Sequence, residues 1–229
     1  MKRFINLLSG DILFQKKYGF YAMYVFFTLL YVGFIYIMPT DWRNNVVSVV
    51  IFSDPALLGL IFIGAIVLFE KSENVTNSLA VSPIRINEYV ISKGISLGII
   101  STLCGVLIAL VAGKDTNWLF FLCGLFVGSC MFTFAGLGMS TRISNFNQFI
   151  VWLIPISLFM AAPGLLYKFW ISSPWWLLHP GAAAYNLIDG TMGPHWPAVI
   201  SLTVWIFITF FFAKTQTVKM FRSLGGAKI

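Results

Sequence analysis

The chain has 229 residues, of which 59% are hydrophobic and only 10% are charged, and its mean hydropathy is +0.86. This composition excludes an ordinary soluble domain and predicts an all-α polytopic membrane protein. The net charge of +7 then indicates membrane topology and contact with anionic lipid, and argues against nucleic acid as a partner.

The first predicted element is a helix over residues 1–18. Phe4, Leu8 and Ile12 recur at helical spacing, while Lys2 and Asp11 belong to a set of interleaved polar residues. This pattern predicts an amphipathic helix that lies in the membrane interface ahead of the first span. The alternative is a basic tail without fixed structure.

Six apolar segments follow, each close to the roughly 20 residues that a helix needs to cross a bilayer core about 30 Å thick. They cover residues 19–38, 54–69, 94–112, 118–140, 148–167 and 197–213. Asp54 begins the second segment, where it suits a helix cap near the outer interface. Pro155 and Pro163 are expected to bend the fifth, because each removes a backbone hydrogen bond.

The distribution of basic residues predicts the orientation. With six spans both termini lie on one side, and that side carries twelve of the fifteen Lys and Arg residues. The other side carries Arg43, Lys114 and Lys168. The excess of positive charge predicts that both termini and the loop 70–93 are cytoplasmic, in a multi-pass protein of the plasma membrane.

Residues 168–196, between the fifth and sixth spans, are interrupted by Pro174, Pro180 and Pro194. The apolar stretches between these prolines are too short to cross a bilayer. We therefore expect one or two short helices here, either at the extracellular surface or as a re-entrant hairpin packed against protein.

Neither an ion-coupled transporter nor an enzyme is indicated. Apart from Asp54 at an interface, the predicted spans contain no Asp, Glu, Lys, Arg or His, whereas proton- and ion-driven transporters need such groups inside the membrane. His179 and His195 lack the spacing of metal ligands, and no hydrolase motif is present. No catalytic residue, metal or cofactor is therefore expected in this chain.

A transporter without its own energy source must be driven by another protein. The polar loop 70–93 is the place where that protein would bind. Glu70 and Glu73 follow the second span, and Ser72 can cap a short helix. Val75 and Leu79 are four residues apart on that helix. This spacing therefore predicts that the helix presents one apolar stripe to a neighbouring protein.

The second half of the loop leads into the third span. Ser82 and Pro83 predict the start of the next helix, which leads through Glu88 and Lys93 into the third span. Glu70 is unfavourable at the carboxyl end of its own helix, by about 0.3–1 kcal/mol, unless a cation compensates. The expected partner is Arg85, Arg142 or a lysine of the N-terminal helix.

The order of these residues resembles the loop of ABC exporter permeases of the type-2 class. Glu70 ends a span, a helix runs past Leu79, Ser82-Pro83 forms a turn, and Lys93-Gly94 enters the next span. The class usually has Gly-Thr ahead of the short helix and Gly-Lys at the entry to the third span. Three segments are similar, more closely, to fluoroquinolone-export permeases, namely residues 17–21, 52–55 and 82–85.

The resemblance implies one permease domain over residues 1–229, with an elbow helix at 1–18 and a cytoplasmic coupling loop at 70–93. Two such chains, identical or different, would work with two ATP-binding subunits that hold ATP and Mg²⁺. They would export amphipathic drugs or peptides. The residues implied in contact with the ATP-hydrolysing subunit are Glu70, Glu73, Val75, Leu79, Ser82, Pro83 and Arg85.

Aromatic and methionine side chains of the first, second and fifth spans are candidates for an adaptable cargo pathway between two permeases. Packing between helices or against lipid is the alternative explanation. The candidates are Tyr24, Tyr31, Phe62, Trp152, Phe159 and Met160. Two other functions stay open: an ABC exporter of lipid or another cargo, and a membrane scaffold that does not transport.

Overall fold

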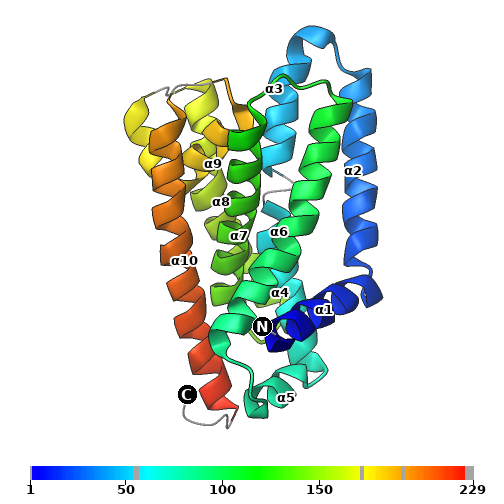
Figure 1. The fold of residues 1–229 in the computed structure, drawn as a ribbon, viewed down its shortest axis with the longest axis vertical. Coiled ribbons are helices and arrows are strands. Elements are labelled where there is room, and N and C mark those ends of the chain that lie inside the picture. Colours follow the sequence, from blue (N-terminus) through cyan, green and yellow to red (C-terminus); the bar gives the residue numbers. More distant parts are fainter. Residues whose placement is uncertain (1, 54–56, 171–172, 192–193, 225–229) are drawn as a thin grey trace.

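A computed structural model describes residues 2–53, 57–170, 173–191 and 194–224, and all regular structure in these ranges is helical. The long helices form an elongated bundle, and α1 lies across one end of it (Figure 1). The elements are α1 (Lys2–Lys17), α2 (Phe20–Ile37), α3 (Thr40–Ile51), α4 (Leu57–Ser72), α5 (Val75–Val81), α6 (Ile86–Val111), α7 (Trp118–Ser140), α8 (Phe146–Phe169), η2 (Pro174–Leu178), α9 (Pro180–Asp189) and α10 (His195–Ser223).

The two ends of the bundle carry different short helices. The α5 end holds α1, α5 and the end of α10, and the α9 end holds α3, η2 and α9 (Figure 1). The start of α1 and the last turn of α10 both lie towards the α5 end (Figure 1).

The predicted all-helical fold is confirmed over the described residues. Among the described residues, five helices are long and apolar enough to cross a membrane: α2, α6, α7, α8 and α10. The predicted second span corresponds to α4, whose 16 residues run beside them in the bundle (Figure 1). Its predicted cap, Asp54, lies outside the described residues. Helix α8 continues through both Pro155 and Pro163.

Helix α7 is the centre of the bundle, because α4, α6, α9 and α10 all pack against it. Small residues let its neighbours come close. At Gly124, a Cβ atom would lie 2.4 Å from the Cβ of Leu187 in α9. A larger residue at position 124 would therefore push α9 away from α7.

Helix α9 lies inside the α9 end, packed against α7, α8 and α10. All of its ten residues are buried. Its approach to α8 needs glycine, since a Cβ at Gly181 would lie 1.9 Å from the carbonyl oxygen of Met160. The proline-interrupted segment thus forms a 3-10 turn and a short helix that pack against protein.

A polar network holds the end of α9. Lys114 Nζ donates to Ser48 Oγ at 2.6 Å and to the Asp189 carbonyl at 3.0 Å. Lys168 Nζ lies 3.2 Å from Asp189 Oδ2. Lys114, predicted on an outer loop, is only 7% exposed. The network joins α3, α8 and α9, and α3 itself was not predicted as a helix.

Helix α1 has one face towards the bundle and one face open. Leu7 and Phe14 pack against the core at the α5 end, whereas Ile5 and Leu13 are 55% and 65% exposed. An apolar exposed face suits a helix that lies in a membrane interface. The depth of α1 in the membrane stays a prediction.

Candidate functional site

Three charged side chains from different parts of the chain meet at the α5 end, and we call them the buried ion cluster. Asp11 comes from α1, Glu70 from α4 and Lys93 from α6. Lys93 Nζ lies 2.6 Å from Asp11 Oδ1 and also forms an ion pair with Glu70 Oε1. All three residues are at most 5% exposed.

Neighbouring hydroxyl groups complete the hydrogen bonding of the two carboxylates. Tyr89 donates to Glu70 Oε2 at 2.8 Å, and Ser92 donates to Asp11 Oδ2. The ammonium of Lys93 lies 5.2 Å from the centre of the Tyr89 ring. Buried charges are stable only when they are paired and hydrogen-bonded in this way. Two carboxylates and one ammonium leave the cluster with one net negative charge when all are ionised.

The structure corrects the expected partner of Glu70. A cation does compensate this carboxylate at the end of its helix, but it is Lys93, and not Arg85, Arg142 or a lysine of α1. Lys93 was already expected on the helix that leads into the third span, and the reason for the different partner is how the helices pack. The face of α6 that carries Lys93 meets Asp11 of α1 and Glu70 of α4.

The predicted cap of the loop helix is also wrong. Ser72 still belongs to α4, and its hydroxyl donates to the Phe69 carbonyl at 2.9 Å. The residue before α5 is Asn74, with a left-handed backbone at φ 58°, a conformation that Asn tolerates better than most residues. Glu73 therefore lies outside α5, where it accepts a hydrogen bond from Tyr18.

Ser82 and Pro83 form a turn rather than the start of α6. The Pro83 carbonyl accepts a hydrogen bond of 3.4 Å from Arg3 of α1. Helix α6 begins after Arg85, whose backbone N–H donates to Glu88 Oε2 at 3.1 Å. That hydrogen bond satisfies one of the free N–H groups at the helix start.

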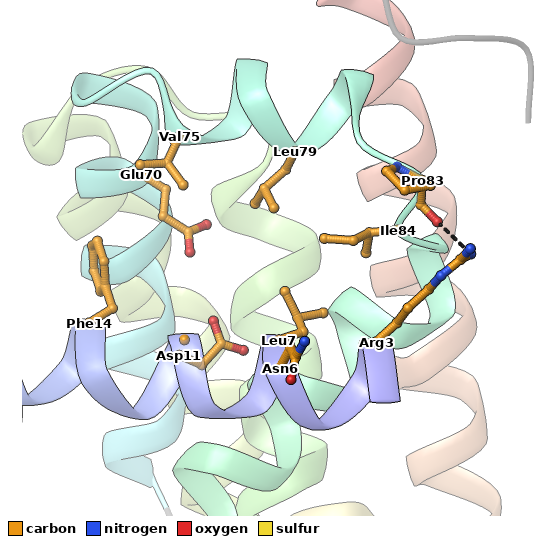
Figure 2. Close-up of a pocket in the computed structure, with 11 residues that line it drawn as sticks. Arg3, Asn6, Leu7, Asp11, Phe14, Glu70, Val75, Leu79, Pro83 and Ile84 are labelled. Atoms are coloured by element: carbon orange, nitrogen blue, oxygen red, sulfur yellow. Dashed lines mark hydrogen bonds between the residues drawn. The ribbon is translucent and has the colours of Figure 1, made fainter. Parts of the chain in front are cut away.

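A cavity of about 420 Å³ separates α5 from α1 and opens onto the buried ion cluster. Val75 and Leu79 point into this cavity, towards α1 (Figure 2). The predicted apolar stripe thus faces the protein itself. The exposed side of α5 carries Asn77, Ser78 and Val81, and Val81 is 78% exposed. A role of Val75 and Leu79 in partner contact stays a prediction.

The cavity is lined by residues of α1, α4, α5 and the turn before α6. From α1 and α4 come Arg3, Asn6, Leu7, Gly10, Asp11, Phe14 and Glu70. From α5 and the turn come Val75, Leu79, Pro83 and Ile84.

The six candidates for a cargo pathway do not gather around one cavity in the described chain. Three of them are core residues at most 4% exposed, namely Tyr24, Phe62 and Met160. Of the others, two on α8 are more than half exposed and one on α2 is half-buried: Trp152, Phe159 and Tyr31. The rings of Tyr24 and Phe62 pack edge to face at 4.8 Å, which favours a packing role for these two.

Sequence reasoning missed Asp11 and Lys93 as site residues. Asp11 is four residues after Leu7 and three before Phe14, so it lies on the face of α1 that packs on the bundle. An acid within an apolar helix face is a signal for a buried cationic partner. Tyr89 and Lys93 are likewise one turn apart on α6.

As far as the described residues go, the site contains no group of three or more His, Cys, Asp or Glu side chains that could hold a metal. What the site can do is couple movements of three helices. Its chemistry is instead ionic: Lys93 holds α1 and α4 to α6 through buried ion pairs. Because unpairing a buried charge costs several kcal/mol, these helices are expected to shift together.

Comparisons with known proteins agree with a membrane export role. Residues 2–219 match the model of the Fluoroquinolones export permease protein family. The chain is also 26% identical over 170 residues to proteins named fluoroquinolones export permease protein from two strains of Mycobacterium tuberculosis. These alignments cover 73% of this chain and 72% of each relative.

Proposed function

This chain belongs to the fluoroquinolones export permease protein family, and on that premise we propose that it is the membrane-spanning permease subunit of an ATP-driven ABC exporter. It moves amphipathic drugs or peptides out of the cell, and a separate subunit binds ATP and Mg²⁺ and hydrolyses the ATP. The names of the two mycobacterial relatives make fluoroquinolones the first cargo to test.

The proposed arrangement has six spans, with α4 as the sixth spanning helix beside the five longer ones. Both termini and α5 lie on the cytoplasmic side, as the distribution of basic residues favours. Two permease chains form the pathway, either as a homodimer or with a related chain.

The buried ion cluster is the observation that carries the proposed mechanism. Helix α5 lies between α4 and α6 in the chain, and the cluster joins both of those helices to α1. A partner that displaces α5 therefore moves α4 and α6 directly. It moves α1 through the ion pair between Lys93 and Asp11.

The outer face of α5 is available for such a partner. Asn77 and Ser78 offer hydrogen-bonding groups there, and Val81 offers apolar surface. Glu73 and Arg85, both exposed, flank this face and supply charges of opposite sign. We assign the contact with the ATPase subunit to this face of α5.

The test is ATP-dependent transport in inverted membrane vesicles that contain this chain and a candidate ATP-binding subunit. Fluorescence of norfloxacin, a fluoroquinolone, reports accumulation inside the vesicles. Accumulation is expected to require hydrolysable ATP and both subunits. Transport by this chain alone, driven by a proton or sodium gradient, would contradict the proposal.

A further inference from the structure

Helix α9 fills the space between α8 and α10 only at the α9 end of the bundle. Its ten residues extend about 15 Å, whereas the 24 residues of α8 and the 29 of α10 extend about 36 and 43 Å. Towards the α5 end the space between α8 and α10 is lined by the end of α7 and the turn after it, through Met139, Arg142 and Ile143. A groove of about 460 Å³ remains there, which we call the α8–α10 groove.

The walls of this groove are largely apolar. Helix α8 contributes Gln148, Trp152 and Ile156, which are spaced by four residues and so share one face. Phe212 of α10 lies on the other side. The side chains of Trp152 and Phe212 are 58% and 41% exposed. In a membrane, such surface is covered by acyl chains rather than by water.

Positive charge lies at the end of the groove nearest the end of α10. Arg142 lines the groove and also a second cavity of about 370 Å³, which Gln216 and Lys219 line as well. The guanidinium donates through Nε to Gln216 Oε1 at 2.8 Å. No carboxylate lines either cavity, and no ion pair in the described part of the chain involves Arg142 or Lys219.

We propose that the α8–α10 groove is a binding site for an anionic phospholipid. The phosphate lies between Arg142 and Lys219, and one acyl chain lies along Trp152 and Phe212. A guanidinium matches the geometry of a phosphate, and basic pockets between membrane helices on the cytoplasmic side are suited to anionic headgroups. The assignment to the inner leaflet rests on the orientation given under the proposed function.

One feature favours a lipid over a free anion. The cationic cavity and the apolar groove share Arg142, so a ligand with a charged head and a long chain can use both at once. A free phosphate or glycerol phosphate would use only the cationic part. An aromatic carboxylate such as norfloxacin could use the groove without the second cavity.

Native mass spectrometry of the purified full chain tests the site, with phosphatidylglycerol and phosphatidylcholine of identical acyl chains as probes. Wild type is expected to retain phosphatidylglycerol at about one per chain and to retain phosphatidylcholine less. Arg142→Gln is expected to weaken phosphatidylglycerol retention about five-fold, the equivalent of about 1 kcal/mol. Lys16→Gln, which removes an exposed charge from α1, is the matched control and is expected to retain the lipid.

A photoactivatable acyl chain gives a second readout, which does not depend on substituting Arg142 at the headgroup end of the site. Phosphatidylglycerol carrying a diazirine is expected to label peptides that contain Trp152 and Phe212, and Trp152→Ala is expected to reduce the label in α8. Arg142→Lys, which keeps the charge, is expected to retain more lipid than Arg142→Gln. Size-exclusion profiles show whether each variant is folded.

Three results would overturn the site. They are equal retention of the two lipids, unchanged retention by Arg142→Gln, and binding of glycerol phosphate as tight as that of phosphatidylglycerol. Arg142-dependent binding of norfloxacin without any lipid binding would also overturn it. Since these measurements use neither ATP nor transport, their failure leaves the exporter proposal standing, and failure of transport leaves the lipid site standing.

Discussion

Lys93 is the residue on which the architecture of the α5 end depends. It is 1% exposed and is the only cation paired with Asp11 or Glu70 among the described residues. Its removal would leave two carboxylates close together in a dry environment. That arrangement is far less stable than the paired one, because each carboxylate then lacks the charge that compensates its loss of water.

Replacing Lys93 by Met is therefore expected to destabilise the protein by about 3–5 kcal/mol, as for other broken buried ion pairs. Thermal unfolding of the detergent-solubilised chain, followed by tryptophan fluorescence, measures this change. Lys16→Met, which removes an exposed lysine, is expected to have little effect. A Lys93→Met variant with wild-type stability would show that the buried ion cluster does not hold the helices together.

Asp189 plays a comparable part at the α9 end. Burial alone would raise the pKa of its carboxyl, but hydrogen bonds from Thr191 and Ser48 and the charges of Lys168 and Lys114 outweigh burial and lower the pKa. A carboxyl with a lowered pKa stabilises the folded state above its usual value of 3.8, and this stabilisation is lost as the pH falls through the folded value.

Asp189→Asn is accordingly expected to lower the unfolding temperature at neutral pH, by the equivalent of about 1–3 kcal/mol. The difference from wild type is expected to shrink as the pH falls below 3.8, the usual pKa of the carboxyl, because wild-type Asp189 becomes protonated there. Unfolding curves of both proteins at a series of pH values check this. A difference that is independent of pH would assign the effect to packing rather than to charge.

At the scale of elements, α5 has two faces with different expected roles. Its inner face, with Val75 and Leu79, closes the cavity above α1 (Figure 2), and its outer face carries Val81, which is exposed. The sequence pattern of two apolar residues four apart was correct, but it could not tell whether the stripe faces a partner or the chain itself. That choice depends on α1, which is more than fifty residues away in sequence.

Two substitutions separate the roles of these faces. Leu79→Asp places a charge in the cavity and is expected to lower both stability and coupled transport. Val81→Asp changes only exposed surface and is expected to leave stability within about 0.5 kcal/mol. If the outer face contacts the ATPase subunit, Val81→Asp nevertheless reduces cargo-dependent ATP hydrolysis. Normal hydrolysis and transport by Val81→Asp would exclude this face as the contact.

At the scale of the whole molecule, the orientation in the membrane can be tested directly. Ser78 is exposed at the α5 end, and Trp175 is 79% exposed in η2. In a chain without its three native cysteines, Ser78→Cys is expected to react with an impermeant maleimide only after the cells are opened. Trp175→Cys is expected to react in intact cells. The opposite pattern would invert the proposed topology.

The amino-acid sequence by itself determined the class of the protein, its helical fold and the position of the polar loop. These properties follow from local composition, because apolar segments of a given length must form helices in a bilayer. It also indicated that Glu70 needs a cation, since the helix dipole is a local effect. The family resemblance likewise depended on local sequence, namely on the polar loop and on a few short segments.

Only the tertiary structure decided which side chains meet. Asp11 and Lys93 are 82 residues apart, and their pairing depends on how α1 lies across α6, which no local pattern specifies. The same holds for the inward face of α5 and for the burial of α9 among α7, α8 and α10. In each case several helices could have supplied the neighbour, and close packing of the whole bundle selected one.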